Sequence, residues 1–445
     1  MSGAFDGERA VVIGLGVAGV SAARVLAAEG ASVLVTEVTA EPAGAVELRA
    51  EGIDVRTGGH APGHLDGATL VVVSPGVSPR TPVMTWAAER GLPVWGEMEL
   101  GARLARVPYV AVTGTNGKTT TTGMLSACLR AAGIDAVACG NIGNPFPAAA
   151  RGPAEVLVVE ASSFQLAQQS SFHPTVSMLL NLAPDHLDWH GSFEAYRDAK
   201  ARVFALQGPG DVHVGNRDDQ AAAAISISAA CDVRWFTLGE PGPNEAGSAD
   251  GRLVAGWSGA DLGAIEPDTP AMRADAAASA VAAHAFGVPD AAIVEAFGDF
   301  VPEHHRGETV AVVDGIWFVD NSKATNPHAT LAAVGDAREV VLIAGGDAKG
   351  VDLSPLAALA PRLVAVVALG ASEGEVVAVF EERVPVKTAG SIEEAVAVAF
   401  EAAAPGGTVL LAPACASWDM FRDYVERGER FAAAARALPK EDVRT

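Results

Sequence analysis

Residues 113–120 read Thr113-Gly114-Thr115-Asn116-Gly117-Lys118-Thr119-Thr120, and they decide the fold class of the chain. An apolar run at 107–112 precedes them, and we expect a helix over 121–132. In such a strand–loop–helix unit, glycines let backbone N–H groups approach a phosphate, while the helix N-terminus and the lysine favour its charge. A hydroxyl directly after the lysine is placed to bind Mg²⁺. The stretch therefore predicts an α/β domain that uses a nucleoside triphosphate.

The stretch is not a complete eight-residue phosphate-binding loop, because Val112 stands where that pattern has its first glycine. A Gly/Asn turn with an exposed lysine is the alternative interpretation. We favour the phosphate loop because strand, glycines, Lys-Thr pair and helix start coincide. The residues expected to contact ATP here are Gly114, Thr115, Asn116, Gly117, Lys118, Thr119 and Thr120.

The composition indicates a globular, multidomain protein. A chain of 445 residues can form two or three domains with ample core. Its net charge of -23 argues against a nucleic-acid partner, whose phosphates would be repelled. The four cysteines are scattered without metal-type spacing, which is typical of a reduced, cytoplasmic protein. Neither a signal peptide nor an apolar run long enough for a membrane span is visible in the sequence.

Strand and helix patterns alternate along three segments, which predicts three α/β domains with mostly parallel sheets flanked by helices. We expect a Rossmann-like domain at 1–96, a phosphate-loop-type domain at 97–300 and a second Rossmann-like domain at 301–445. The stretch 240–270 is rich in Gly, Pro, Asp and Ala, and we expect it to be irregular. A final helix is expected over 418–438.

A second glycine loop, Gly14-x-Gly16-x-x-Gly19, fits the dinucleotide fingerprint, and Glu37 stands about where an acidic ribose ligand belongs. Physically the pattern says that a diphosphate can rest on a helix N-terminus, without saying which diphosphate. Tight strand–helix packing without a ligand is the alternative. Ser74-Pro75-Gly76 ends a later strand of the same sheet, where ligands of open α/β sheets bind.

Further motifs follow in order along the rest of the chain. They are Glu160-Ala161-Ser162-Ser163-Phe164-Gln165-Leu166, Asn181-Leu182-Ala183-Pro184-Asp185-His186-Leu187-Asp188, Tyr196-Arg197-Asp198-Ala199-Lys200, Asp320-Asn321-Ser322-Lys323-Ala324-Thr325-Asn326-Pro327, Gly345-Gly346-Asp347-Ala348-Lys349 and Pro413-Ala414-Cys415-Ala416-Ser417-Trp418-Asp419. Together with the two glycine loops, this ensemble resembles the Mur ligase family of bacterial cell-wall synthesis over nearly the whole chain. The Ser-Ser-Phe-Gln-Leu, Ser-Lys-Ala-Thr-Asn and Pro-Ala-Cys-Ala-Ser stretches resemble those members that add D-glutamate to UDP-N-acetylmuramoyl-L-alanine.

The resemblance implies an ATP-dependent amide ligase in which a substrate carboxylate is phosphorylated and an amine attacks the acyl phosphate. It implies that Lys118 contacts the β- and γ-phosphates and that Thr119 and Glu160 ligate Mg²⁺. His186 would help to bind a second Mg²⁺, and Lys200, if carbamylated, would supply further oxygen ligands. From the residues alone, His186 is a loop histidine and Lys200 an ordinary helix lysine.

The resemblance also implies that each domain binds one substrate: the first the UDP-substrate, the second ATP and the third the amino acid. The UDP-substrate contacts are Gly14, Leu15, Val17, Ala18, Glu37, Gly76, Asn141, Ser162 and Ser163. Arg306 and Asn321 are assigned to ATP. The amino-acid contacts are Lys323, Thr325, Lys349 and Ser417, with Lys323 also near the acyl phosphate. Because amine and ATP are expected on different domains, we expect a hinge near 299–302.

Three departures from the family pattern leave alternatives open. Residues 271–275 replace a His-Asn pair expected near adenine, Asn321 replaces an aspartate, and Ala18 and Thr39 replace a threonine and an arginine near UDP. A specialised Mur-type paralogue with another amino-acid preference, a folylpolyglutamate-type ligase, a nicotinamide-dependent oxidoreductase and a catalytically silent binding module are the alternatives. For the ligase the expected partners are small molecules, with no nucleic acid and no membrane span, and a monomer is expected.

Overall fold

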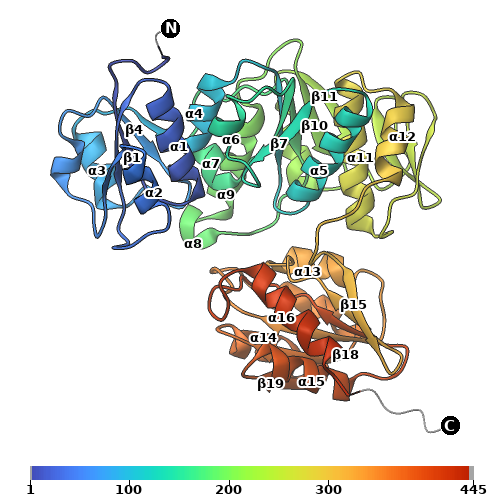
Figure 1. Cartoon of the computed structure of the whole chain (residues 1–445). Coiled ribbons are helices and arrows are strands. Elements are labelled where there is room, and N and C mark those ends of the chain that lie inside the picture. Colours follow the sequence, from blue (N-terminus) through green and yellow to red (C-terminus); the bar gives the residue numbers. More distant parts are fainter. Residues whose placement is uncertain (1–2, 440–445) are drawn as a thin grey trace. The chain divides into compact units, whose positions relative to one another are not determined.

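The computed structural model describes residues 3–439, which form three β-sheets with flanking helices (Figure 1). These residues divide into two compact units. The first unit comprises the residues up to Leu182, Arg197–Ile265 and Ala274–Phe300. The second comprises Ala183–Tyr196, Glu266–Arg273 and the residues from Val301 onward. The predicted fold class of three sheet-based, mostly parallel α/β domains is confirmed.

The first sheet belongs to the first unit and is fully parallel, in the order β3-β2-β1-β4-β5. Its strands are β1 (Arg9–Ile13), β2 (Ser32–Thr36), β3 (Asp54–Arg56), β4 (Leu70–Val73) and β5 (Val94–Gly96). Its helices are α1 (Val17–Ala28), α2 (Ala45–Ala50), η1 (Pro62–Leu65) and α3 (Pro82–Glu89). Strand β4, which lies between β1 and β5, is apolar and buried throughout, as expected for a strand covered on both faces.

The second sheet also belongs to the first unit and has nine strands in the order β14-β13-β12-β11-β10-β9-β6-β8-β7. The parallel strands that surround the phosphate loop are β6 (Tyr109–Thr113), β7 (Ala136–Gly140), β8 (Val156–Glu160), β9 (Val176–Leu179), β10 (Val212–Asn216) and β11 (Asp232–Phe236). The remaining strands are β12 (Glu245–Ala249), β13 (Arg252–Ala255) and β14 (Asp261–Gly263). Helices associated with this part of the chain are α5 (Lys118–Ala131), α6 (Phe146–Ala149), α7 (Ser163–Ala167), α8 (Leu187–His190), α9 (Phe193–Ala201), η2 (Arg202–Phe204), α10 (Gln220–Ser226), α11 (Pro270–Ala285) and α12 (Asp290–Gly298).

The prediction that 240–270 is irregular was wrong, because β12, β13 and β14 form an antiparallel extension of the second sheet. Small residues allow this close packing: a Cβ on Gly247 would collide with the carbonyl of Gly239, and one on Gly256 with that of Gly242. Strands built on glycine and alanine lack the β-branched residues by which strands are usually recognised. For this reason β12, β13 and β14 could not be recognised from the composition of the stretch.

Helix α4 (Glu97–Leu104) connects the first sheet to the second within the first unit. It packs against α1 and α6, and one apolar cluster runs from β1 and α1 through α4 to β8. An ion pair between Arg151 and Glu29, 2.6 Å long, also links the two parts. The first two sheets therefore share a core.

The third sheet lies in the second unit, in the order β15-β16-β20-β17-β18-β19. Its strands are β15 (Glu308–Val313), β16 (Ile316–Asp320), β17 (Val340–Gly345), β18 (Leu363–Leu369), β19 (Val386–Ala389) and β20 (Thr408–Leu411), and only β15 is antiparallel to its neighbour. Its helices are α13 (Pro327–Val334), η3 (Ser354–Arg362), α14 (Glu373–Phe380), α15 (Ile392–Ala402) and α16 (Tyr424–Arg436). Apolar clusters cover both faces.

Two expected helices begin elsewhere in the structure. Helix α5 begins at Lys118, three residues before its expected start, because Gly117 adopts a left-handed φ of +86° and serves as its N-cap. Helix α16 begins at Tyr424 rather than at residue 418, because Asp423 caps it by accepting the backbone N–H of Glu426. Within 3–439, the helices are too short or too polar to cross a bilayer.

Candidate functional site

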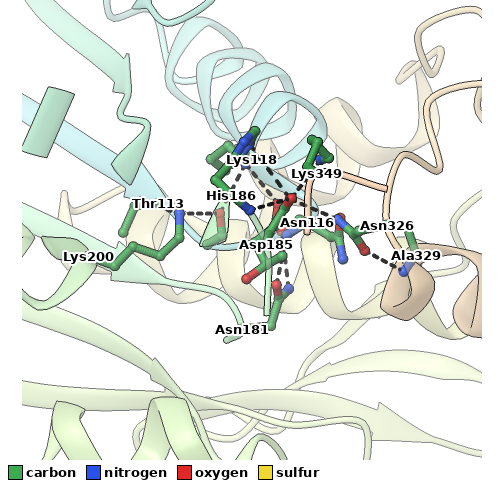
Figure 2. A network of polar contacts seen from close by, with 12 residues as sticks. Thr113, Asn116, Lys118, Asn181, Asp185, His186, Lys200, Asn326, Ala329 and Lys349 are labelled. Atoms are coloured by element: carbon green, nitrogen blue, oxygen red, sulfur yellow. Dashed lines mark hydrogen bonds and ion pairs between the residues drawn. The ribbon is translucent and has the colours of Figure 1, made fainter. Parts of the chain in front are cut away.

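The phosphate loop lies at the carboxyl end of β6, an inner strand of the second sheet that pairs with β9 and β8. Lys118 donates from Nζ to the carbonyls of Gly114, at 3.0 Å, and Thr115, at 2.9 Å, so the loop curls around its own lysine (Figure 2). Gly117 is required for two reasons, since its φ is positive and a Cβ there would collide with the carboxylate of Asp275. The loop is thus preformed as a ring of backbone dipoles at a helix N-terminus, the arrangement that binds phosphate.

Asn181 braces this loop from the end of β9, which neighbours β6. Its Oδ1 accepts the backbone N–H of Asn116 at 2.8 Å, and its Nδ2 donates to the Asn116 carbonyl at 3.1 Å (Figure 2). Asn181 is part of a motif noted in the sequence, but no role was predicted for it. Its place directly after a strand next to β6 is the signal that could have identified it.

Glu160 ends β8, whose register places it beside Val112 of β6. Its side chain is buried, and Oε1 accepts from Asn141 Nδ2 at 2.8 Å. Among residues 3–439, Oε2 has no hydrogen-bond partner. A buried carboxylate oxygen without a partner is costly. Hard oxygen ligands of this kind suit Mg²⁺, so the residues at the end of β8 fit a divalent cation.

Lys200 is buried at the end of α9, and its Nζ donates to the carbonyl of Gly114 at 2.7 Å and to Thr113 Oγ1 at 3.4 Å (Figure 2). Lys200 is therefore buried against the phosphate loop and is not exposed on the surface of α9. The burial of Lys200 could not be predicted from the sequence of α9, because it depends on contacts with the phosphate loop.

In the N-terminal glycine loop, part of the Gly14-x-Gly16-x-x-Gly19 pattern is required for packing between β1 and α1. A Cβ on Gly19 would collide with the carbonyl of Gly14, so close strand–helix contact requires this glycine. The Glu37 carboxylate accepts the backbone N–H of Leu15 at 2.7 Å and that of Thr39 at 2.9 Å. Burial alone would raise the pKa of Glu37, but these backbone donors outweigh it and the pKa is lowered.

The remaining UDP candidates are spread over this unit. Val17 and Ala18 open α1, and Gly76 follows β4, on the carboxyl edge of the first sheet. Asn141 follows β7, while Ser162 and Ser163 follow β8 on the second sheet.

In the second unit, the amino-acid candidates lie at the carboxyl ends of three adjacent strands, β16, β20 and β17. Lys323 and Thr325 follow β16, Lys349 follows β17, and Ser417 follows β20. Backbone hydrogen bonds hold these loops together: Ala414 donates to Ala324 at 2.9 Å, and Ala416 donates to Asp347 at 2.8 Å. The structure thus brings the four predicted residues to one edge.

Asp185 is the acceptor at the centre of a buried cluster in this unit. It accepts from Lys349 Nζ at 2.6 Å and from Asn326 Nδ2 at 3.2 Å (Figure 2). The His186 ring lies 3.8 Å from the same carboxylate, and His186 has a left-handed φ of +53°. Asn326 also caps α13 by accepting from Ala329 N at 2.9 Å. From the sequence, Asp185 was expected only to flank His186, and its contacts with Lys349 and Asn326 were not predicted.

Arg306 and Asn321 also lie in the second unit, on neighbouring segments. The carbonyl of His305 accepts from Lys323 N at 3.3 Å, which places the segment around Arg306 against the loop that follows β16. Asp320 is fully buried, accepts from Ser322 N at 2.9 Å, and lies 2.7 Å from His305 Nδ1. Its carboxylate therefore holds the loop that follows β16.

Arg427 of α16 holds two of the three loops together. Its buried guanidinium donates to Ser322 Oγ at 3.0 Å, to the Ser322 carbonyl at 2.8 Å and to the Cys415 carbonyl at 3.1 Å. Burial lowers the pKa of Arg427 to about 10, so the group stays charged near neutral pH. The role of Arg427 could not be predicted from the sequence, because nothing in an amphipathic helix marks one arginine as buried.

Comparison with known proteins assigns most of the chain to models of one family. Residues 8–96 match the Mur ligase MurD-like N-terminal domain, 112–275 the Mur ligase middle domain, and 305–415 the Mur ligase glutamate ligase domain. The chain is 44% identical to a UDP-N-acetylmuramoylalanine–D-glutamate ligase of Frankia casuarinae, covering 97% of this chain and 95% of that protein. It is 42% identical to the protein of the same name from Streptomyces coelicolor, over 98% of this chain and 100% of that one.

Solved structures agree on the fold. UDP-N-acetylmuramate-alanine ligase MurC from Thermotoga maritima superimposes with a TM-score of 0.61 at 17% identity, covering 96% of this chain and 99% of that chain. MurF from Acinetobacter baumannii gives a TM-score of 0.61 at 17% identity, over 96% of this chain and 91% of that chain. At such identities the likeness extends to the fold and no further.

Proposed function

Because this chain belongs to the Mur ligase family, we propose that it joins D-glutamate to UDP-N-acetylmuramoyl-L-alanine with hydrolysis of ATP to ADP, in peptidoglycan precursor synthesis. Relatives named for that reaction match over nearly their whole length, which supports the amino-acid preference. The geometric observation that carries the chemistry is the unpartnered Glu160 Oε2, buried next to a preformed phosphate loop. We therefore favour this ligase over the specialised paralogue, the oxidoreductase and the silent binding module.

Lys118 and the loop from Gly114 to Thr120 would hold the triphosphate by backbone N–H groups and one cation. Thr119 and Glu160 would hold Mg²⁺, which neutralises charge as the γ-phosphoryl group passes to the substrate carboxylate. Arg306 and Asn321 would contribute to ATP binding from the second unit. ATP and Mg²⁺, with two ions, are the proposed cofactors.

His186 and Lys200 are the proposed holders of the second ion. Lys200 would do this as a carbamate, since an ammonium cannot ligate a cation. Its burial among the carbonyl of Gly114 and the hydroxyl of Thr113 shields the group from solvent. Carbamylation exchanges a positive charge for a negative one, so it would suit a loop that already contains a bound cation.

The substrates would divide among three domains, 1–96 for the UDP group, 97–300 for ATP and 301–445 for D-glutamate. Gly14, Leu15, Val17, Ala18, Glu37 and Gly76 would bind the UDP group, and Asn141, Ser162 and Ser163 the muramoyl part. Lys323, Thr325, Lys349 and Ser417 would bind the amino acid. The partners would be small molecules, the protein would act as a monomer, and the reaction would take place in the cytoplasm, where ATP is available.

The test is phosphate release from ATP by the purified protein with each component omitted in turn. Release should need ATP, Mg²⁺, UDP-N-acetylmuramoyl-L-alanine and D-glutamate together, and the product mass should show one added glutamate. A panel of L-glutamate, D-aspartate and D-alanine measures the preference. Phosphate release that is indifferent to the amino acid would contradict the proposal, and a stronger response to another amino acid would indicate the specialised paralogue.

A further inference from the structure

Glu97 is a buried carboxylate that the proposed reaction leaves without a role. It is the first residue of α4, at the junction of the first two sheets, and only 1% of its surface is exposed. Within 3–439, no lysine, arginine or histidine forms an ion pair with it. A buried charge is normally paired, because desolvation is costly. Its retention here therefore calls for another explanation.

The two oxygens of Glu97 accept hydrogen bonds from two different loops. Oε1 accepts from the backbone N–H of Phe146 at 3.0 Å, and Oε2 accepts from Gln165 Nε2 at 3.0 Å. Phe146 opens α6 and closes the loop that contains Asn141. Gln165 lies in the first turn of α7. Glu97 thus connects the segment after β7 to the segment after β8.

Gln165 transmits this connection to Ser162. Its Oε1 accepts from Ser162 N and from Ser162 Oγ, both at 2.9 Å, and its own backbone N–H donates to Ser162 Oγ at 3.3 Å. An anionic Glu97 can only accept, so the Gln165 amide must turn its NH₂ group toward Glu97 and its oxygen toward Ser162. Ser162 Oγ then donates its proton to Gln165, and its remaining lone pair can accept a donor from a ligand.

The other loop is connected to the proposed metal ligand. Asn141 donates from Nδ2 to Glu160 Oε1 at 2.8 Å and from its backbone N–H to the Glu160 carbonyl at 2.9 Å. Glu97 therefore contacts both segments that carry the proposed muramoyl contacts, and neither contact reaches the phosphate loop directly.

We propose that Glu97 is a positioning residue for the muramoyl part of the acceptor, which it serves by bracing the Asn141 loop against the Ser162–Gln165 turn and by fixing Ser162 Oγ as an acceptor. The inference rests on the proposed function, in which Asn141 and Ser162 contact the muramoyl part of the substrate. The proposal gives a role in substrate binding to a residue of α4, the helix that connects the first two sheets, although Glu97 itself does not contact the substrate.

The brace is sensitive to protonation. Burial raises the pKa of Glu97 to about 7, against the opposing effect of hydrogen bonds from Gln165 and Phe146. Cys139 of β7 also faces this region, but burial raises the pKa of its thiol to about 12, so it stays neutral. A proton on Glu97 converts one accepting oxygen into a donor that faces an N–H group. Below a pH of about 7 the brace is therefore weakened.

Other charged groups near this helix do not titrate in the same range. Burial would raise the pKa of Glu99, but donors from Ser170 and Ser171 lower it to about 2. Glu99 is also paired with Arg103 at 2.7 Å. On α1, which packs against α4, Arg24 is paired with Glu51 at 2.6 Å. A transition near pH 7 in this region therefore belongs to Glu97.

Glu97→Gln tests the proposal, because its amide presents one donor where the carboxylate presents two acceptors. We expect the KM for the UDP-substrate to rise roughly tenfold while the KM for ATP changes less than about twofold. In the wild type, the KM for the UDP-substrate should rise as the pH falls through about 7, and this dependence should be absent in Glu97→Gln. Glu99→Gln is the matched control, since Glu99 is equally buried on the same helix but binds Ser170 and Ser171 instead. It should leave both KM values unchanged.

A second measurement does not depend on turnover. The side-chain amide ¹⁵N resonance of Gln165 should titrate with a midpoint near pH 7 in the wild type and lose this titration in Glu97→Gln. Equal changes in both KM values, equal effects of the two variants, or an amide resonance that ignores pH would overturn the proposal. A wild-type protein without ligase activity but with the expected Gln165 titration would overturn the proposed function instead, and the substrate role of Glu97 with it.

Discussion

The ammonium of Lys349 lies 2.6 Å from the carboxylate of Asp185, and both side chains are buried in the second unit. Lys349 was expected from the sequence as a ligand for the amino-acid carboxylate. Its pairing with Asp185 means that a substrate carboxylate would bind a cation that is already oriented and partly neutralised. Asn326 donates to the same Asp185, so the aspartate fixes two side chains at once.

Asp185→Ala should destabilise the protein by about 3 kcal/mol, because it leaves the ammonium of Lys349 buried without its partner. Urea denaturation measures this. The double variant Asp185→Ala/Lys349→Met should recover part of the loss, since neither buried charge remains. If the free-energy changes of the single variants Asp185→Ala and Lys349→Met simply add in the double variant, the two side chains are not coupled and this interpretation is wrong.

Glu160→Gln should abolish ligation yet stabilise the protein by about 1 kcal/mol in the absence of Mg²⁺, because it removes a buried charge with an unpartnered oxygen. Thermal denaturation with a chelator measures the stability. Added Mg²⁺ and ATP should raise the melting temperature of the wild type much more than that of the variant. Glu89→Gln, at an exposed carboxylate of α3, should behave as the wild type does in both conditions.

Glu97 and Glu99 should give opposite pH dependences of stability from neighbouring places on α4. The folded-state pKa of Glu97 is raised to about 7 from 4.5, because burial disfavours the carboxylate more than its two accepted hydrogen bonds favour it. The stability that Glu97 contributes to the fold is therefore full below about pH 4.5 and is lost as the pH rises through about 7, even though the carboxylate form makes the stronger hydrogen bonds to Gln165 and Phe146. Glu97→Gln lacks that loss, and its stability relative to the wild type should improve by about 2–3 kcal/mol between pH 5 and pH 8.

Glu99 has the reverse sign. Its pKa is lowered to about 2, so its contribution is present above about 4.5 and is lost as the pH falls toward about 2. Glu99→Gln should therefore be most destabilised relative to the wild type at neutral pH and least so in acid. Urea denaturation of both variants at several pH values distinguishes the two carboxylates, and parallel curves would contradict the assignment.

The strand–loop–helix unit around Lys118 and the three mostly parallel sheets could be predicted from sequence because each signal is local. Glycines, Lys118 and an apolar strand stand within one short stretch, and their geometry follows from the backbone. The roles of Glu97, Asp185 and Arg427 could not be predicted, because each side chain contacts partners 49 to 164 residues away that only the folded sheets bring near. The strands β12 to β14 were missed because their packing depends on the absence of side chains.

Arg427→Lys should destabilise the second unit by about 3 kcal/mol, because an ammonium cannot bridge Ser322 and Cys415 as the guanidinium fork does. Hydrogen exchange of the loops after β16 and β20 should increase in the variant. Arg430→Lys is the control on the same helix, since Arg430 pairs with Glu393 at the surface. It should cost less than about 0.5 kcal/mol, and a similar loss in both variants would contradict a special role for Arg427.

Gly428→Ala should be destabilising although it places alanine inside a helix, where that change ordinarily stabilises by about 0.5–1 kcal/mol. The reason is space: the added Cβ would collide with His305 Nδ1 and Asp320 Oδ2, which lie 2.7 Å from each other beneath α16. Gly374→Ala in α14 is the matched control, because nothing lies within 4 Å of its Cβ position, and it should gain the ordinary stability. If His305→Ala is added, the cost of Gly428→Ala should fall, since the imidazole is one of the two groups in the way. A Gly428→Ala variant that gains as much stability as Gly374→Ala would show that the His305–Asp320 pair can move aside, and would contradict its assignment as a fixed support for the loop after β16.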